Sequence, residues 1–122
     1  MSALTKNILK DKSFRFAIRI VNLREYLVHE KGEHVLSKQL LRSGTAIGAL
    51  VREAKNAESK PDFIHKLGIA QKECDETLYW LELLSETKFI TKTEYQSVFS
   101  DANELLKIIR SSIITAKKSI NL

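Results

Sequence analysis

Six basic side chains in the first half of the chain are the residues best suited by type to bind a ligand. A guanidinium group can hold a phosphate through two parallel hydrogen bonds, and an ammonium group attracts it as a point charge. The candidate phosphate-binding residues are Arg15, Arg19, Lys38, Arg42, Arg52 and Lys55. No aromatic-rich ribonucleoprotein motif, helix-turn-helix or KH loop accompanies them, so the pattern favours phosphate contact over base reading. The alternatives are salt bridges, interface contacts or simple hydration of these side chains.

Patterns for metal binding are missing from the sequence. A di-iron bundle needs a Glu-x-x-His pair on each of two helices, but His29 and His34 have no acidic residue three positions earlier. His65 does follow Asp62 at that spacing, in a position that better fits helix capping. No histidine has a second histidine four residues away, as a zinc-protease helix requires. We expect neither a metal nor another cofactor.

Nucleophilic and acid–base chemistry are not indicated either. Cys74 lies on the apolar stripe of its predicted helix, where a buried thiol is inert, whereas a catalytic thiolate needs exposure and a lowered pKa. Lys72, Glu73 and Glu76 form a charged cluster in the same helix. Such clusters can do acid–base chemistry when buried, but more often they are ion pairs. We expect no catalytic residue and therefore no enzyme.

The composition is that of a single globular domain. The chain has 122 residues, 43% hydrophobic and 29% charged, which is too short for two cores and too apolar for disorder. Its net charge of +5 comes from residues 1–60, where 12 Lys and Arg outnumber 6 Asp and Glu, against 8 and 9 in residues 61–122. This asymmetry suits a polyanionic partner. No apolar run approaches the ~20 residues that span a bilayer, and no signal peptide is evident, so we expect a cytoplasmic protein.

Helical periodicity and capping signals predict four helices and no strand. The expected helices cover residues 13–31, 33–58, 60 to about 86, and 91–118. Ser59 followed by Asp62 marks the third start, and Thr91 with Glu94 forms a capping box at the fourth. Residues 1–12 show no clear period and are expected to form an N-terminal arm, which leaves residues 13–122 as the bundle domain.

The connections between the predicted helices are short, and short connections make consecutive helices antiparallel. Helices two to four carry apolar residues at i, i+3, i+4 and i+7 spacing, which is the pattern of a bundle core. The expected fold is an all-α, antiparallel up-down-up-down four-helix bundle.

The first and third predicted helices carry more apolar side chains than one core requires. More than half of the circumference of residues 13–31 is apolar, and the third helix has a second apolar face formed by Ile69, Trp80 and Leu83. Contiguous exposed apolar surface usually marks an interface, and Trp is enriched at interface centres. We expect self-association through this face; the alternative is scattered surface exposure.

Two glycines lie four residues apart within the second predicted helix. Gly44 and Gly48 each cost about 1 kcal/mol relative to Ala in a helix interior. A phosphate-binding glycine loop is excluded, because the Walker spacing and a preceding strand are missing. Small residues on one flank of a helix allow a neighbour to approach, so we expect close helix packing at these positions.

Several stretches of the sequence resemble one bacterial family. They are QLLRSGTAIGA at 39–49, REA at 52–54, KPDFIHKL at 60–67, AQKEC at 70–74 and ETLYWLELL at 76–84. These stretches resemble the four-helix-bundle proteins also called the 23S rRNA-intervening sequence family, over roughly residues 14–118. The resemblance implies an antiparallel bundle that assembles as a homopentameric ring, with no established catalytic residue.

The residues and the resemblance together lead to one expected function and one alternative. We expect a non-enzymatic homo-oligomer, a pentamer by resemblance, that binds structured, rRNA-like RNA through phosphate contacts. The alternative is a protein-interaction scaffold whose basic face binds an acidic protein.

Overall fold

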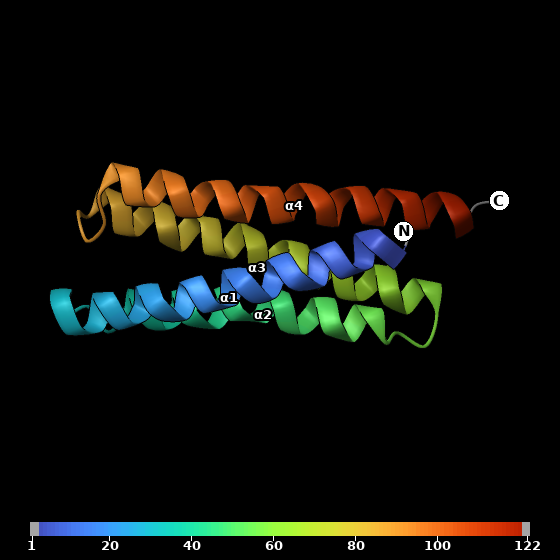
Figure 1. The fold of residues 1–122 in the computed structure, drawn as a ribbon, viewed down its shortest axis with the longest axis horizontal. Helices are drawn as coiled ribbons and strands as arrows, with labels where there is room; N and C mark the ends of the chain where they lie inside the picture. The colour runs from blue at the N-terminus through green and yellow to red at the C-terminus, as the bar shows by residue number, and fades with distance from the viewer. Residues whose placement is uncertain (1–2, 121–122) are drawn as a thin grey trace.

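Four long helices make up the described part of the chain, residues 3–120 of the computed structural model (Figure 1). They are α1 (Ala3–Lys31), α2 (Leu36–Lys55), α3 (Lys60–Glu86) and α4 (Lys92–Ile120). No strand occurs within these described residues. The predicted all-α four-helix bundle is therefore confirmed.

The helices run alternately up and down the long axis of the molecule (Figure 1). Each of α1, α2 and α3 packs along the helix that follows it in the chain, and α1 touches α4 less extensively to close the bundle. The α2–α3 connection lies at the same end as both chain termini, while the other two connections lie at the opposite end (Figure 1). We call the first of these the terminal end and the second the loop end.

The predicted N-terminal arm is wrong, because α1 begins at Ala3 rather than near Ser13. Leu9, within the supposed arm, is fully buried, and it continues the core-facing stripe that runs on to Phe16. The stripe is hard to recognise because Ser13 interrupts it. Ser13 is buried and its hydroxyl donates to the Lys10 carbonyl at 3.1 Å, so it lies inside the helix and does not cap it. The termini of the predicted arm and bundle, residues 1–2 and 121–122, lie outside the described residues.

α2 begins at Leu36, three residues later than predicted, and the buried carboxylate of Glu33 caps its first turn. Glu33 accepts hydrogen bonds from the backbone N–H groups of Val35 and Leu36 at 3.1 and 2.8 Å through one oxygen, and from that of Ser37 at 2.7 Å through the other. The Ser37 hydroxyl donates back to the Glu33 carbonyl at 2.8 Å. Glu33 therefore satisfies donors of the first helical turn from outside the helix. At its other end α2 stops at Lys55, three residues before the predicted Glu58.

The starts of α3 and α4 follow the predicted capping signals. The Ser59 hydroxyl accepts from the Asp62 N–H at 3.2 Å. The Thr91 hydroxyl accepts from the Glu94 N–H at 3.1 Å while the Glu94 carboxylate accepts from the Thr91 N–H at 2.8 Å, which is a complete capping box. Each pair satisfies backbone donors that a helix start leaves without an intrahelical partner.

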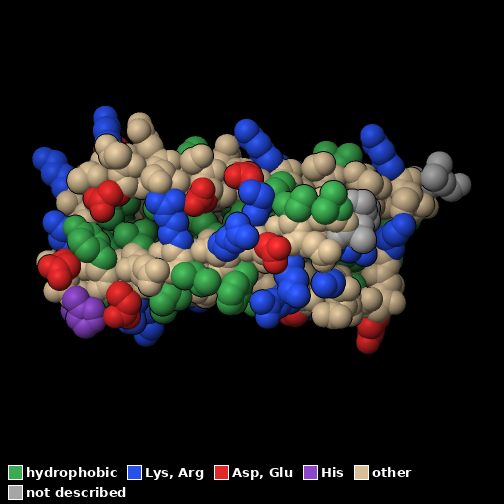
Figure 2. Space-filling model, viewed as in Figure 1, with side chains coloured by type: hydrophobic (Ala, Val, Ile, Leu, Met, Phe, Trp, Pro, Cys, Tyr) green, Lys and Arg blue, Asp and Glu red, His purple; other side chains and the backbone are tan. Residues whose placement is uncertain are grey.

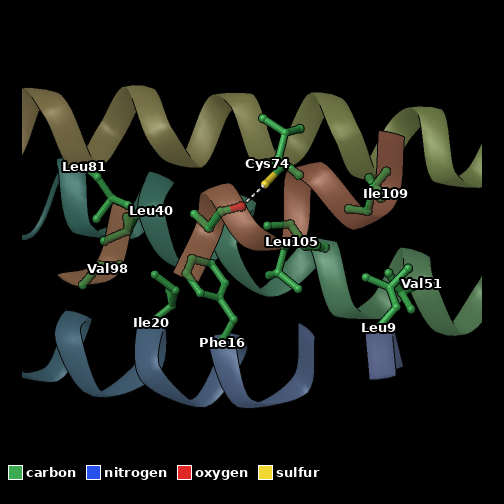
Figure 3. Close-up of a cluster of buried hydrophobic side chains, with 14 of the residues drawn as sticks. Leu9, Phe16, Ile20, Leu40, Val51, Cys74, Leu81, Val98, Leu105 and Ile109 are labelled. Carbon is green, nitrogen blue, oxygen red and sulfur yellow. Dashed lines mark hydrogen bonds between the residues drawn. The ribbon is translucent and has the colours of Figure 1, made fainter. Parts of the chain in front are cut away.

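The core extends along the whole bundle axis and receives side chains from all four helices (Figure 3). The side chains labelled there come from Leu9, Phe16, Ile20, Leu40, Val51, Cys74, Leu81, Val98, Leu105 and Ile109.

The close helix approach expected at the two glycines occurs between α1 and α2. A Cβ atom on Gly44 would lie 2.8 Å from Ile20 Cγ1, and one on Gly48 would lie 3.3 Å from the Ser13 carbonyl oxygen. Carbon atoms normally approach to about 3.5–4.0 Å. A side chain at position 44 would therefore force the Ile20 side chain, or α1 itself, to move.

Candidate nucleic-acid interface

The structure places the six predicted phosphate-binding residues in unequal surroundings. Arg19 on α1 bridges to α4. Its guanidinium donates to the Asp101 carboxylate at 2.7 Å, to the Ser97 hydroxyl at 2.6 Å and to the Ser97 carbonyl at 3.3 Å. These contacts neutralise the charge of Arg19 and help to hold α1 on α4, the pair of packed helices with the least extensive contact.

Arg42 is paired in a similar way, between α2 and α3. Its guanidinium donates to the Glu73 carboxylate at 3.1 Å and also to the Glu76 carboxylate. Glu76 in turn accepts the indole N–H of Trp80 at 3.1 Å. Glu73 and Glu76 of the charged cluster on α3 are thus ion-paired with Arg42 of α2, which is the more common role of such clusters.

The other four basic candidates have no carboxylate partner among residues 3–120. Arg52 lies with its guanidinium 5.1 Å from the centre of the Phe14 ring, a cation–π contact that leaves its charge uncompensated. Arg15, Lys38 and Lys55 are exposed, and their side chains form no hydrogen bond or ion pair within the described chain. These four are free to bind an anion.

The free residues do not form one patch. Lys38 lies in the first turn of α2 and Arg52 in its last turn, and fourteen residues of helix separate their Cα atoms by about 21 Å. A single phosphate cannot bridge that distance, so any polyanion that contacts both must be extended.

An exposed apolar strip on α1 lies beside Arg52. Phe14, Ile18 and Val21 are 51%, 47% and 42% exposed, and apolar side chains are visible along this helix between basic ones (Figure 2). A shallow groove of about 300 Å³ between α1 and α2 is lined by Phe14, Ala17, Thr45, Gly48, Ala49 and Arg52. The excess apolar surface expected of the first helix is therefore present on the molecule.

The predicted interface residues on α3 are less available than this strip. Ile69, Trp80 and Leu83 are half-buried. Trp80 packs edge-on against the Tyr79 ring, with centres 5.0 Å apart, and its indole N–H is already bonded. Tyr79, which the sequence did not single out, is 58% exposed. Its position directly before Trp80 was the only available signal.

A lysine-lined cavity at the terminal end was not predicted from the sequence. This cavity has a volume of about 290 Å³, and Lys6, Lys55 and Lys60 line it together with Phe63. Lys6 belongs to the segment predicted as an arm, so its convergence with Lys55 was not visible. Which lysines meet there depends on how the helices pack together, and no local sequence pattern indicates it.

Within residues 3–120, no cluster of three or more metal-ligating side chains occurs. The Cys74 thiol is buried on α3 and donates to the Ala102 carbonyl at 3.3 Å (Figure 3). Burial above all, and then the neighbouring Asp75 carboxylate, raise the pKa of Cys74 to about 12. Cys74 therefore stays a neutral thiol at physiological pH. No helix in the described part of the chain is long and apolar enough to cross a membrane.

The fold and this surface define a small all-helical bundle protein with uncompensated basic residues and an exposed apolar strip. Residues 5–111 match the family model described as 23S rRNA-intervening sequence protein, and the chain belongs to this family. The chain is similar to a protein of unknown function from the S23 ribosomal protein family of Bacteroides thetaiotaomicron, whose crystal structure is known. The two sequences are 55% identical, and the two structures superpose with a TM-score of 0.89. That similarity covers 89% of this chain and 97% of the other. No curated protein is significantly similar to the chain.

Proposed function

We propose that this protein is a non-enzymatic homo-oligomer that binds structured, rRNA-like RNA through contacts with phosphate groups. Membership of a family described by its link to 23S rRNA supports an rRNA-related role, and in that role the protein would act in the cytoplasm. The proposal includes no catalytic residue, because Cys74 is buried and protonated.

The observation that carries the proposal is the set of basic side chains that have no carboxylate partner among residues 3–120. Arg15, Lys38, Arg52 and Lys55 keep their charge available, and a polyanion would gain affinity by releasing counterions to them. We leave Arg19 and Arg42 out of the contact set, since carboxylates of α4 and α3 already neutralise them. The chain contains no base-reading motif, so affinity would depend on shape and charge.

The exposed apolar strip of α1 supports self-association. Phe14, Ile18 and Val21 would be removed from water in an interface between copies, and apolar area buried in this way stabilises an assembly. Five subunits is the number implied by the family resemblance. Repeating a basic surface in this way would add avidity without a strong single site.

The first test measures mass and RNA binding of the purified protein. Light scattering gives the mass, and fluorescence anisotropy with a labelled RNA hairpin gives affinity over a range of KCl concentrations. We expect an oligomer, and a logarithm of affinity that falls linearly with the logarithm of salt by about 0.7–0.9 per phosphate neutralised. A monomer would refute the assembly, and the absence of RNA binding at low salt would refute the function.

Paired variants test the contact set. Lys38→Gln with Arg52→Gln should weaken RNA binding and reduce the salt slope by about 2, since each lost phosphate contact removes about 1. Lys72→Gln with Lys107→Gln changes the net charge equally at exposed positions outside the set. Equal losses in both double variants would show that net charge alone, and not these positions, governs binding.

The alternative function is a scaffold whose basic face binds an acidic protein. Arg42 shows the kind of contact that such a partner would make, because its guanidinium forms ion pairs with two carboxylates of α3. An oligomer that ignores the RNA hairpin but retains an acidic protein would favour this alternative.

A further inference from the structure

The terminal end of the bundle carries a group of lysines that have no carboxylate partner within residues 3–120. The start of α1, the end of α2 and the start of α3 meet there, and they contribute Lys6, Lys55 and Lys60 to one cavity of about 290 Å³. Both chain termini lie at this end (Figure 1). The volume of the cavity is that of roughly ten water molecules, which is enough for a phosphate group with part of its hydration shell.

None of the three lysines is neutralised by a carboxylate within the described chain. The Lys6 ammonium lies 5.6 Å from the centre of the Phe63 ring, and the Lys60 ammonium donates to the Ser119 hydroxyl. Lys55 has no hydrogen-bond or ion-pair partner in residues 3–120. By contrast, Lys66 on the same helix as Lys60 is paired with Glu53 at 3.1 Å.

The charge around the cavity is strongly positive. Lys117 and Lys118 in the last turn of α4 add to the three lysines of the cavity, while the acidic residues in the α2–α3 connection and the first turn of α3 are Glu58 and Asp62. Two helix starts and two helix ends meet here, so the helix dipoles largely offset one another and the side chains decide the sign.

The loop end provides an internal comparison. Its cavity, of about 390 Å³, is also lined by three lysines, Lys31, Lys88 and Lys92, but Glu86 and Glu94 line it as well. Lys31 even stacks on an aromatic ring, that of Tyr26, at 6.0 Å, as Lys6 does on Phe63. The two ends thus match in lysines and differ in carboxylates.

We propose that the cavity at the terminal end is a binding site for backbone phosphates of RNA, and that the RNA contacts the bundle end-on. This inference rests on the proposed RNA-binding function and locates its main contact at Lys6, Lys55 and Lys60. Ammonium groups from three helices converge on one volume, so a single phosphate can be reached by more than one of them. The basic residues along α2 then contact the flanking backbone.

The test compares two triple variants with the same change in net charge. The terminal-end variant is Lys6→Gln, Lys55→Gln and Lys60→Gln, and the loop-end control is Lys31→Gln, Lys88→Gln and Lys92→Gln. Binding of a fluorescent RNA hairpin is measured by anisotropy over a range of KCl concentrations. We expect the terminal-end variant to lose at least about tenfold in affinity at low salt, with a salt slope smaller by 2–3. The control should bind nearly as the wild type does.

Circular dichroism and light scattering test whether each variant keeps its fold and mass, and only variants that do so are compared. Equal losses in both triple variants would overturn the site, because net charge alone would explain them. Wild-type affinity in the terminal-end variant, with weakened binding in the Lys38→Gln and Arg52→Gln variant, would overturn the site and leave the proposed function standing. Failure of the wild-type protein to bind the hairpin would remove both.

Discussion

Substitution of Gly44 by Ala tests whether the close contact between α1 and α2 determines the stability of this bundle. The added Cβ atom would lie 2.8 Å and 2.9 Å from the two γ-carbons of Ile20, a side chain that is fully buried. These separations are roughly 0.6 Å or more inside the usual carbon–carbon contact distance. Ile20 or the whole of α1 must therefore move.

The expected magnitude follows from two opposing effects. Replacing Gly by Ala within a helix stabilises it by about 1 kcal/mol, whereas overpacking a core costs about 1–3 kcal/mol. Gly68 on α3 has nothing within 4 Å of its added Cβ, so Gly68→Ala receives the first effect alone. We expect Gly44→Ala to be less stable than Gly68→Ala by about 1–3 kcal/mol, with Gly48→Ala between them.

Urea unfolding followed by circular dichroism measures these differences in unfolding free energy. A double variant provides a further check: with Ile20→Ala in place, Gly44→Ala should become neutral or stabilising, because both γ-carbons are gone and only the Cβ atom of residue 20, at 3.3 Å, remains. If Gly44→Ala were as stable as Gly68→Ala in the otherwise unchanged chain, the argument from close approach would be refuted.

Two further predictions concern titrating groups. Burial and the Asp75 carboxylate raise the pKa of Cys74 from 9.0 to about 12. At pH 8 the thiol should therefore react with a disulfide reagent about a thousandfold more slowly in the folded protein than in urea. Rapid modification of the folded protein would contradict this. Burial of Glu33 opposes its ionisation, but hydrogen bonds from the backbone N–H groups of Leu36 and Ser37 outweigh it and hold the pKa of Glu33 below 4.5. Its charged form therefore stabilises the fold above about pH 4.5, and this contribution is lost as the pH falls through the lowered pKa. Glu33→Gln should cost about 0.5–2 kcal/mol at pH 7 and less at pH 3, as measured by urea midpoints; a difference that does not shrink in acid would refute the assignment.

The helices and their order were predictable because capping and periodicity are local properties. Ser59 with Asp62 and Thr91 with Glu94 act within one helical turn, so α3 and α4 begin within one residue of the predicted positions. The start of α1 was not predictable in this way. Ser13 has the residue type of a cap, and only the packing of Leu9 against the rest of the core shows that the helix continues through it.

The ion-pair partners of the charged residues could not be predicted from the sequence. Arg19 and Asp101 are separated by 82 positions, and no local pattern indicates that they meet. The same applies to Arg42 and Glu73, which are 31 positions apart. A count of basic residues therefore overstated the charge available on the arginines.

Local chemistry in the chain was enough to establish an all-helical bundle, a basic first half, and the lack of metal and nucleophile patterns. Residue spacing within a helix decides these properties, and spacing can be read directly. The assembled bundle decided which charges remain free. Folding brings carboxylates of α3 and α4 to Arg42 and Arg19. Among residues 3–120 it brings none into ion-pair contact with Lys6, Lys55 or Lys60, because charge compensation depends on distances across the bundle and not along the chain.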